Sequence, residues 1–148
     1  IIQNQLYNGH NCGAGEFGMM PYLDSYYEDY CSGQFFMNSH KTTGEEVFNG
    51  AKKGDAQALR IFNEFGYHLG SAMIAILYAM DPELIVLGGS VSKSYDFYKA
   101  ALWKRLQDFA YSPTVGRLTI EISENPNIPV LGAAALYYNA QEASKKQL

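Results

Sequence analysis

The sequence predicts an α/β domain in which helices pack against a parallel or mixed sheet. Four consecutive branched apolar residues, Leu84 to Leu87, run directly into Gly88-Gly89. Such an unbroken apolar run is typical of a strand covered by helices on both faces. A long amphipathic helix is predicted before this strand, over 56–80, and an alternating strand after it, over 118–123. One β-α-β crossover would join the two strands, and we expect it to be right-handed.

The first part of the chain is predicted to be rich in loops. Residues 1–7 have the pattern of a strand that ends at the turn Asn8-Gly9, and residues 10–24 are loop-like, with several glycines. A short helix over 28–38 is expected to be interrupted near Gly33.

Two N-terminal caps are predicted for the helices that follow. Thr43 and Glu46 fit a capping box, which indicates a helix from there to about Lys52 that ends at Gly54. Asp55 fits the N-cap of the long helix. The buried face of that helix is marked by apolar residues at three- and four-residue spacing: Leu59, Phe62, Phe65, Leu69, Ala72, Met73, Ile76 and Met80.

Two glycines stand one turn apart inside the long helix, at Gly66 and Gly70. Glycine in a helix interior costs about 1 kcal/mol relative to alanine. We therefore expect another element, a sheet or a partner subunit, to pack closely against this part of the helix.

The last third of the chain is predicted to contain helix, strand and helix. Residues 95–109 repeat the helical pattern, and the strand over 118–123 alternates apolar and polar residues, which predicts one wet face or a sheet edge. Pro129 suits the first position of a closing helix. The inner face of that helix is expected to carry Leu131, Ala134, Ala135 and Tyr138.

Composition limits the classes of function. The 148 residues are 47% hydrophobic and 18% charged, as in a single folded domain. A net charge of −4 without a large basic cluster argues against nucleic acid as a partner of this segment. No apolar run has the roughly 20 residues that a membrane span needs, and we expect no signal peptide within these residues. Cys12 and Cys31 form no Cys-x-x-Cys pair, so we expect a reducing cytoplasm and no zinc site.

Two carboxylates are candidate ligand-binding residues. Glu16 lies among Gly13, Gly15 and Gly18 on the loop that leaves the first strand, where a carboxylate can accept hydrogen bonds from two neighbouring sugar hydroxyls. The alternative is a solvated side chain in a turn. Glu28 lies at the start of a predicted helix, where its charge is favoured by the helix dipole alone. No pair of titratable residues forms a complete acid–base catalyst.

The end of the buried strand is a second candidate site. Ligands of α/β sheets bind at the carboxyl ends of strands, and glycine lets the backbone approach them closely. Gly88, Gly89 and the following Ser90 occupy this place, although a tight turn would explain them equally well. The segment is neither a G-x-G-x-x-G fingerprint nor a G-x-x-x-x-G-K-[ST] phosphate loop.

In order and spacing, these segments resemble the carboxyl-terminal half of the ROK family (repressor, open reading frame, kinase). Gly9 with Ala14-Gly15-Glu16-Phe17-Gly18 is similar to the family's G-x-x-x-x-A-G-E-[ILF]-G loop, and residues 28–33 are similar to its E-x-Y-x-S-G helix. Three later segments also match: Gly54-Asp55-x-x-Ala58, residues 81–89, and Leu131-Gly132-Ala133-Ala134.

The resemblance implies an actin/hexokinase-like (ribonuclease H-like) lobe, with residues 1–148 as the single carboxyl-terminal lobe of a two-lobed sugar kinase. It implies ATP-dependent phosphorylation, with Mg²⁺, of a hexose or an N-acetylhexosamine. Glu16 and Glu28 would contact sugar hydroxyls, and Gly88, Gly89 and Ser90 would line the adenosine side of the ATP site. The general base and the phosphate loops would lie upstream of Ile1, so this chain alone is expected to be inactive.

The sequence departs from the family pattern at its zinc motif. Met19 stands where the family usually has a histidine that contacts sugar and zinc, and no cysteine occurs between Cys12 and Cys31. The resemblance therefore implies a member without zinc, with altered sugar preference, weaker sugar affinity or loss of kinase activity.

Two other functions compete with the kinase. One is a sugar-sensing transcriptional repressor of the same family, whose DNA-binding element would lie outside this chain. The other is a dimerisation lobe with no ligand of its own. Whichever function is correct, a homo-oligomer is expected, because a lone lobe would expose an apolar cleft wall.

Overall fold

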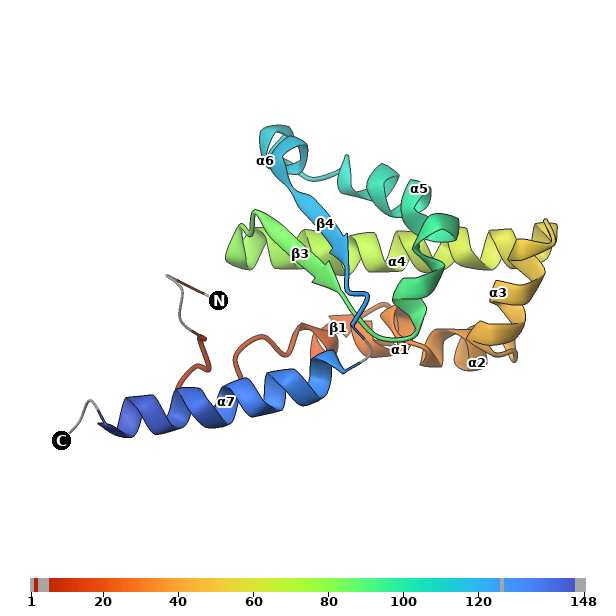
Figure 1. The fold of residues 1–148 in the computed structure, drawn as a ribbon. Helices are drawn as coiled ribbons and strands as arrows, with labels where there is room; N and C mark the ends of the chain where they lie inside the picture. The colour runs from red at the N-terminus through yellow and green to blue at the C-terminus, as the bar shows by residue number, and fades with distance from the viewer. Residues whose placement is uncertain (1, 3–5, 126, 146–148) are drawn as a thin grey trace.

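The fold was analysed in a computed structural model that describes residues 2, 6–125 and 127–145 (Figure 1). Most of the strand predicted over 1–7 falls outside the described residues. The predicted loop over 10–24 contains a short 3₁₀ helix, η1 (Phe17–Met19), and the first strand of a small hairpin, β1 (Pro21–Tyr22). Its second strand is β2 (Ser25–Tyr26), which pairs with β1 in antiparallel fashion.

Two packed helices form the centre of the molecule, α4 (Ala56–Met80) and α5 (Tyr95–Leu106) (Figure 1). The Asp55 carboxylate accepts a hydrogen bond of 2.7 Å from the backbone N–H of Ala58, so the predicted N-cap is confirmed. The helix ends at Met80, and its C-cap residue Asp81 takes a left-handed conformation with φ of 41° just before Pro82. Both bounds of α4 agree with the prediction.

The glycines of α4 face α5. A Cβ placed on Gly66 would lie 2.4 Å from the carbonyl oxygen of Tyr98, and one on Gly70 would lie 2.8 Å from the Cβ of Arg105. The expectation of close packing is confirmed. Our expectation that the packed element would be a sheet or a partner subunit is wrong, because a helix of the same chain fills the place.

Three short helices cover one end of this pair: α1 (Tyr27–Cys31), α2 (Gln34–His40) and α3 (Gly44–Lys52). The predicted break at Gly33 separates α1 from α2. The predicted capping box of α3 is complete, because the Thr43 hydroxyl accepts from the Glu46 N–H at 3.2 Å and the Glu46 carboxylate accepts from the Thr43 N–H at 2.9 Å. The rings of Phe35 and Phe36 are fully buried against α4 and complete the core.

The sheet consists of β3 (Leu84–Leu87) and β4 (Thr119–Ile122), which are parallel, with Leu84 opposite Thr119. Between them lie η2 (Val91–Ser94), α5 and α6 (Ser112–Arg117), of which α6 was not predicted. One face of β4 is exposed, as its alternating sequence predicted.

The expectation that β3 is covered on both faces is wrong for the described structure. Ile85 and Leu87 pack against the core of α4 and α5, whereas Leu84 is 44% exposed and Val86 is 54% exposed. The physical reason is that the described helices cover only one face of this strand.

The last helix, α7 (Ile128–Lys145), runs along one side of the molecule, away from α5 (Figure 1). Pro129 is its second residue, one position later than predicted. The expected inner face is not buried: Leu131, Ala134, Ala135 and Tyr138 are all exposed. None of the helices in the described part of the chain has the length and apolar character that a bilayer crossing requires.

Candidate functional site

Glu16 precedes the 3₁₀ helix η1 in a turn that we call the Glu16 loop (residues 13–20). Its carbonyl oxygen accepts from the N–H of Met19 at 3.1 Å, and the carbonyl of Phe17 accepts from the N–H of Met20 at 3.1 Å. These bonds close η1 directly after Glu16. The Glu16 side chain is exposed and therefore available to a ligand.

Glu28 faces the same loop from the first turn of α1. A Cβ placed on Gly18 would lie 3.0 Å from the Glu28 Oε2 atom, so the carboxylate rests directly against the glycine backbone. The structure thus places Glu28 against the Glu16 loop, in contact with a residue two positions after Glu16. Both side chains are exposed.

The hairpin between Gly18 and Glu28 ties the loop to α1. The N–H of Tyr27 donates to the carbonyl of Met20 at 3.1 Å, so the end of η1 and the start of α1 are directly bonded. The hydroxyl of Tyr30 donates to the Asp24 carboxylate in the hairpin turn. That hydrogen bond lowers the pKa of Asp24 below its ordinary value, so this carboxylate stays ionised to a lower pH than an unbonded one.

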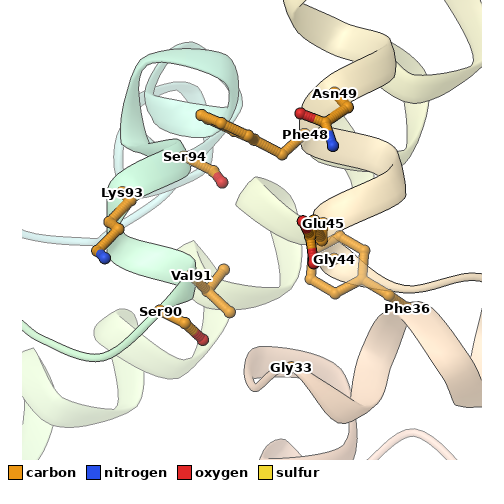
Figure 2. A pocket seen from close by; sticks show the side chains of 10 residues that line it. All are labelled: Gly33, Phe36, Gly44, Glu45, Phe48, Asn49, Ser90, Val91, Lys93 and Ser94. Atoms are coloured by element: carbon orange, nitrogen blue, oxygen red, sulfur yellow. The ribbon is translucent and has the colours of Figure 1, made fainter.

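A cavity of about 590 Å³ lies between the α2–α3 region and the segment that follows β3 (Figure 2). This volume is typical of small-molecule sites. In Figure 2 the ring of Phe48 reaches from α3 toward the segment that carries Ser94. The lining of the cavity combines aromatic and aliphatic side chains with polar ones: Gly33, Phe36, Gly44, Glu45, Phe48, Asn49, Ser90, Val91, Lys93 and Ser94.

The second predicted site meets this cavity at one residue. Ser90 lines it, whereas Gly88 and Gly89 lie just before the lining, at the end of β3. Gly89 has φ of 82°, a conformation that favours glycine, and its carbonyl accepts from the Ser92 hydroxyl at 2.7 Å. This turn directs the chain from β3 into η2 and sets Ser90 and Val91 on the cavity wall.

Sequence reasoning missed the opposite wall of the cavity, which α2 and α3 supply. The capping box at Thr43 fixed where α3 begins, but it gave no sign that Phe48 and Asn49 would face the end of β3. That approach depends on tertiary packing, here the contact between the Phe48 and Phe97 rings at 5.8 Å.

The carboxylate pair and the cavity are neighbours. Glu28 lies in the first turn of α1, and Gly33, two residues beyond its last turn, lines the cavity. One five-residue helix therefore connects the two candidate sites.

Nucleophilic chemistry is not supported by Cys31, which lies on the same helix. Burial, and to a lesser degree the nearby charge of Glu28, raises the pKa of this thiol to about 12. The thiol is therefore protonated at neutral pH and unreactive. Within the residues that the structure describes, no cluster of three or more histidine, cysteine or acidic side chains could hold a metal ion.

Comparison with known proteins identifies the family. The profile of the ROK family matches residues 1–140. The chain belongs to the ROK family. Its resemblance in motifs and its actin/hexokinase-like α/β fold are thereby confirmed.

Relatives of the chain within the ROK family include both enzymes and regulators. A glucokinase of Thermotoga maritima is 24% identical over 87% of this chain and 45% of its own length. The xylose repressor of Bacillus subtilis is 24% identical over 92% of this chain and 40% of its own. A solved ROK family protein from Streptococcus pneumoniae, in complex with sucrose, superposes with a TM-score of 0.74 at 21% identity over 94% of this chain and 53% of that one.

The chain thus spans about half the length, or less, of the relatives and solved structures that it matches over most of its own length.

Proposed function

We propose that this chain is the carboxyl-terminal lobe of an ATP-dependent sugar kinase, which phosphorylates a hexose or an N-acetylhexosamine. The observation that carries the proposal is that the Glu16 loop, with Glu28 against its Gly18, and an aromatic-walled cavity lie at the two ends of α1. Phosphoryl transfer depends mainly on positioning two substrates and stabilising charge. The chain offers one binding element for each substrate.

The Glu16 loop supplies the sugar side. A sugar presents neighbouring hydroxyl donors, and an ionised carboxylate accepts hydrogen bonds from them more strongly than a neutral group does. Glu28 rests against Gly18 of the Glu16 loop, so we propose that both carboxylates face one sugar ring. Met19, which replaces the family's histidine, is 57% exposed beside them and offers an apolar contact in its place.

The cavity supplies the adenosine side. Aromatic and aliphatic walls from Phe36, Phe48 and Val91 suit the faces of a base, and Asn49 and Ser90 can pair with its edge or with ribose hydroxyls. Of the residues predicted for this side, Ser90 lines the cavity, and Gly88 and Gly89 precede it directly in the chain. We propose that the nucleoside also contacts the opposite wall, which carries Phe48 and Asn49.

The described residues do not fit Mg²⁺ or a triphosphate chain. They contain no acidic cluster at the cavity, and Lys93 is the only cation in its lining. Mg²⁺, when bound with the nucleotide, would neutralise phosphate charge. This chain's own residues bind and orient the sugar and the nucleoside, and the transfer step itself needs groups from elsewhere in the complete protein.

The test is to change each carboxylate to its neutral isostere in the complete gene product. Losing a hydrogen bond to a charged group should raise the sugar KM roughly ten- to hundredfold in Glu16→Gln and in Glu28→Gln. The ATP KM should stay nearly unchanged. Phe48→Leu provides the matched contrast, because it should raise the ATP KM and leave the sugar KM alone. Normal sugar kinetics in both glutamate variants would contradict the assignment.

A sugar-sensing repressor is the second candidate, and the match to the xylose repressor is the observation that favours it. It would use the same carboxylates for sugar but would not transfer phosphate. Sugar binding without ADP release in the complete gene product would favour the repressor over the kinase.

A further inference from the structure

The proposed sugar site depends on the β1–β2 hairpin, which is too short to be stable by itself. Each strand contributes only two residues, β1 with Pro21–Tyr22 and β2 with Ser25–Tyr26. An isolated pair of strands, even a longer one, is at best marginally stable in water. Yet this hairpin sets the distance between Glu16 and Glu28, because it is the chain that joins them. Side-chain contacts must therefore fix it.

Those contacts converge on Tyr22. Its ring stacks on Tyr27 with centroids 4.3 Å apart and meets the edge of Tyr30 at 5.4 Å. Its hydroxyl lies 3.0 Å from the Nδ1 atom of His68, which is 46 residues away, on α4. Tyr22 is thus the point at which the hairpin is fastened to the central helix of the molecule.

His68 is built into the core to receive that hydroxyl. It is 7% exposed, and its ring also packs against Phe35 at 5.6 Å. The Nε2 atom lies 3.8 Å from the Glu64 carboxylate, whose other oxygen lies 3.2 Å from the Nε2 atom of His40. The carboxylate favours a proton on Nε2 of His68, which leaves Nδ1 free to accept from Tyr22.

A second hydrogen bond connects the stacked Tyr22 and Tyr27 rings to α4. The Tyr27 hydroxyl donates to the carbonyl of Ser71, one turn further along α4, at 3.3 Å. The Ser71 hydroxyl in turn accepts from the Nε atom of Arg105 on α5 at 2.9 Å. The hydroxyls of Tyr22 and Tyr27 therefore both hydrogen-bond to α4, and Ser71 of α4 in turn hydrogen-bonds to Arg105 of α5.

We propose that Tyr22 and His68 are positioning residues of the sugar site, which hold the hairpin so that Glu28 rests against Gly18 and faces the same ligand as Glu16. This inference rests on the proposed function. Neither residue needs to touch the sugar. Their effect would be on how well the two carboxylates are preorganised for binding, and uniform binding of this kind changes KM and not kcat.

The experiment compares three variants in the complete gene product. Tyr22→Phe removes the hydroxyl and keeps the ring stack, so the protein should stay folded. His68→Leu removes the acceptor, and His68→Asn restores one near the place of Nδ1. Tyr111→Phe, an exposed tyrosine far along the chain, is the matched control.

We expect Tyr22→Phe and His68→Leu to raise the sugar KM roughly five- to thirtyfold, the effect of one lost hydrogen bond in a buried setting. The value of kcat should stay within about twofold of the wild type, as for any change in uniform binding. His68→Asn should recover most of the KM, and Tyr111→Phe should change nothing. An unchanged KM in Tyr22→Phe would overturn the proposal, as would equal KM values in the two His68 variants.

Hydrogen exchange separates this proposal from the proposed function. The N–H groups of Met19, Met20 and Tyr27 are hydrogen-bonded within the loop and hairpin, so their exchange reports on this segment. They should exchange faster in Tyr22→Phe, with the amides of α5 unchanged. Unchanged exchange at these sites would overturn the positioning role. Faster exchange in a protein that binds no sugar would overturn the proposed function instead.

Discussion

At the scale of residues, the lack of a side chain at Gly18 decides where the Glu28 carboxylate can lie. The Glu28 carboxylate occupies the space that a Cβ at position 18 would need, at 3.0 Å. The absent side chain at position 18 therefore allows Glu28 to rest against the Glu16 loop. The sequence marked Gly18 as part of the loop motif but did not predict this contact, because the hairpin brings Glu28 to it.

Gly18→Ala should displace the Glu28 carboxylate and raise the sugar KM several-fold, by roughly the effect of weakening one charged hydrogen bond. The stability of the protein should change little, because the carboxylate is exposed and can move. Gly13→Ala is the control, since nothing lies within 4 Å of a Cβ at that position. Steady-state kinetics on both variants make the comparison, and equal sugar KM values would refute the steric argument.

His68 should give the protein a pH-dependent stability. Burial lowers the pKa of His68 below 6.5, and the nearby Glu64 opposes this only in part. The unfolded chain then binds the proton more readily than the folded one. The stabilising contribution is complete above about pH 6.5 and is lost as the pH falls through the lower, folded-state pKa.

We therefore expect urea unfolding to show lower stability at about pH 5.5 than at about pH 7.5. His68→Asn should reduce that difference, because the titrating group is gone. His10→Asn should leave it unchanged, since His10 is exposed on a loop. An undiminished pH dependence in His68→Asn would contradict this assignment to His68.

At the scale of elements, the close approach of α4 and α5 depends on two missing side chains. Gly66→Ala would bring a Cβ to 2.4 Å from the Tyr98 carbonyl oxygen, which belongs to a backbone that cannot turn aside. Overpacking of this kind costs about 1–3 kcal/mol. The free energy of unfolding should fall by about that amount, measured by urea denaturation.

Gly116→Ala in α6 is the matched control for Gly66→Ala. No atom lies within 4 Å of its Cβ position, so the change should be neutral or stabilise by up to about 1 kcal/mol through helix propensity. If both alanines had the same effect, the interhelical contact would not explain the glycine at 66.

Elements with local signals were the ones that the sequence could predict. The caps at Thr43 and Asp55 lie within a few residues of what they specify, and both were confirmed. The buried face of α4 was predicted only in part: Phe62, Phe65, Ala72 and Met73 are buried, whereas Met80, which we assigned to that face, is 43% exposed because no described element packs on the last turn there. The burial of β3 and α7 could not be predicted in this way. Their apolar faces show that something should cover them, but the described chain does not supply it.

At the scale of the molecule, the exposed apolar faces of β3 and α7 predict self-association. Leu84 and Val86 on β3 and Leu131 on α7 are exposed, in a chain that spans about half the length of relatives. We expect the chain produced by itself to self-associate through these surfaces. Light scattering would show this, and a strict monomer at high concentration would contradict it.

The candidate site was predictable where a motif marked it. Glu16, Glu28, Gly88, Gly89 and Ser90 were named as site residues from motifs, and their roles stay predictions; of these, Ser90 lines the cavity. The Phe48 wall and the Tyr22–His68 anchor were not identified, since they join residues that lie far apart in the chain.

The most direct test of the account is a coupled ADP-release assay on the complete gene product, with ATP, Mg²⁺ and a panel of aldohexoses and N-acetylhexosamines. The account predicts turnover with at least one of these sugars, and loss of that turnover at low sugar concentration in Glu28→Gln. Sugar binding without ADP release across the whole panel would contradict the kinase and favour a sugar-sensing regulator.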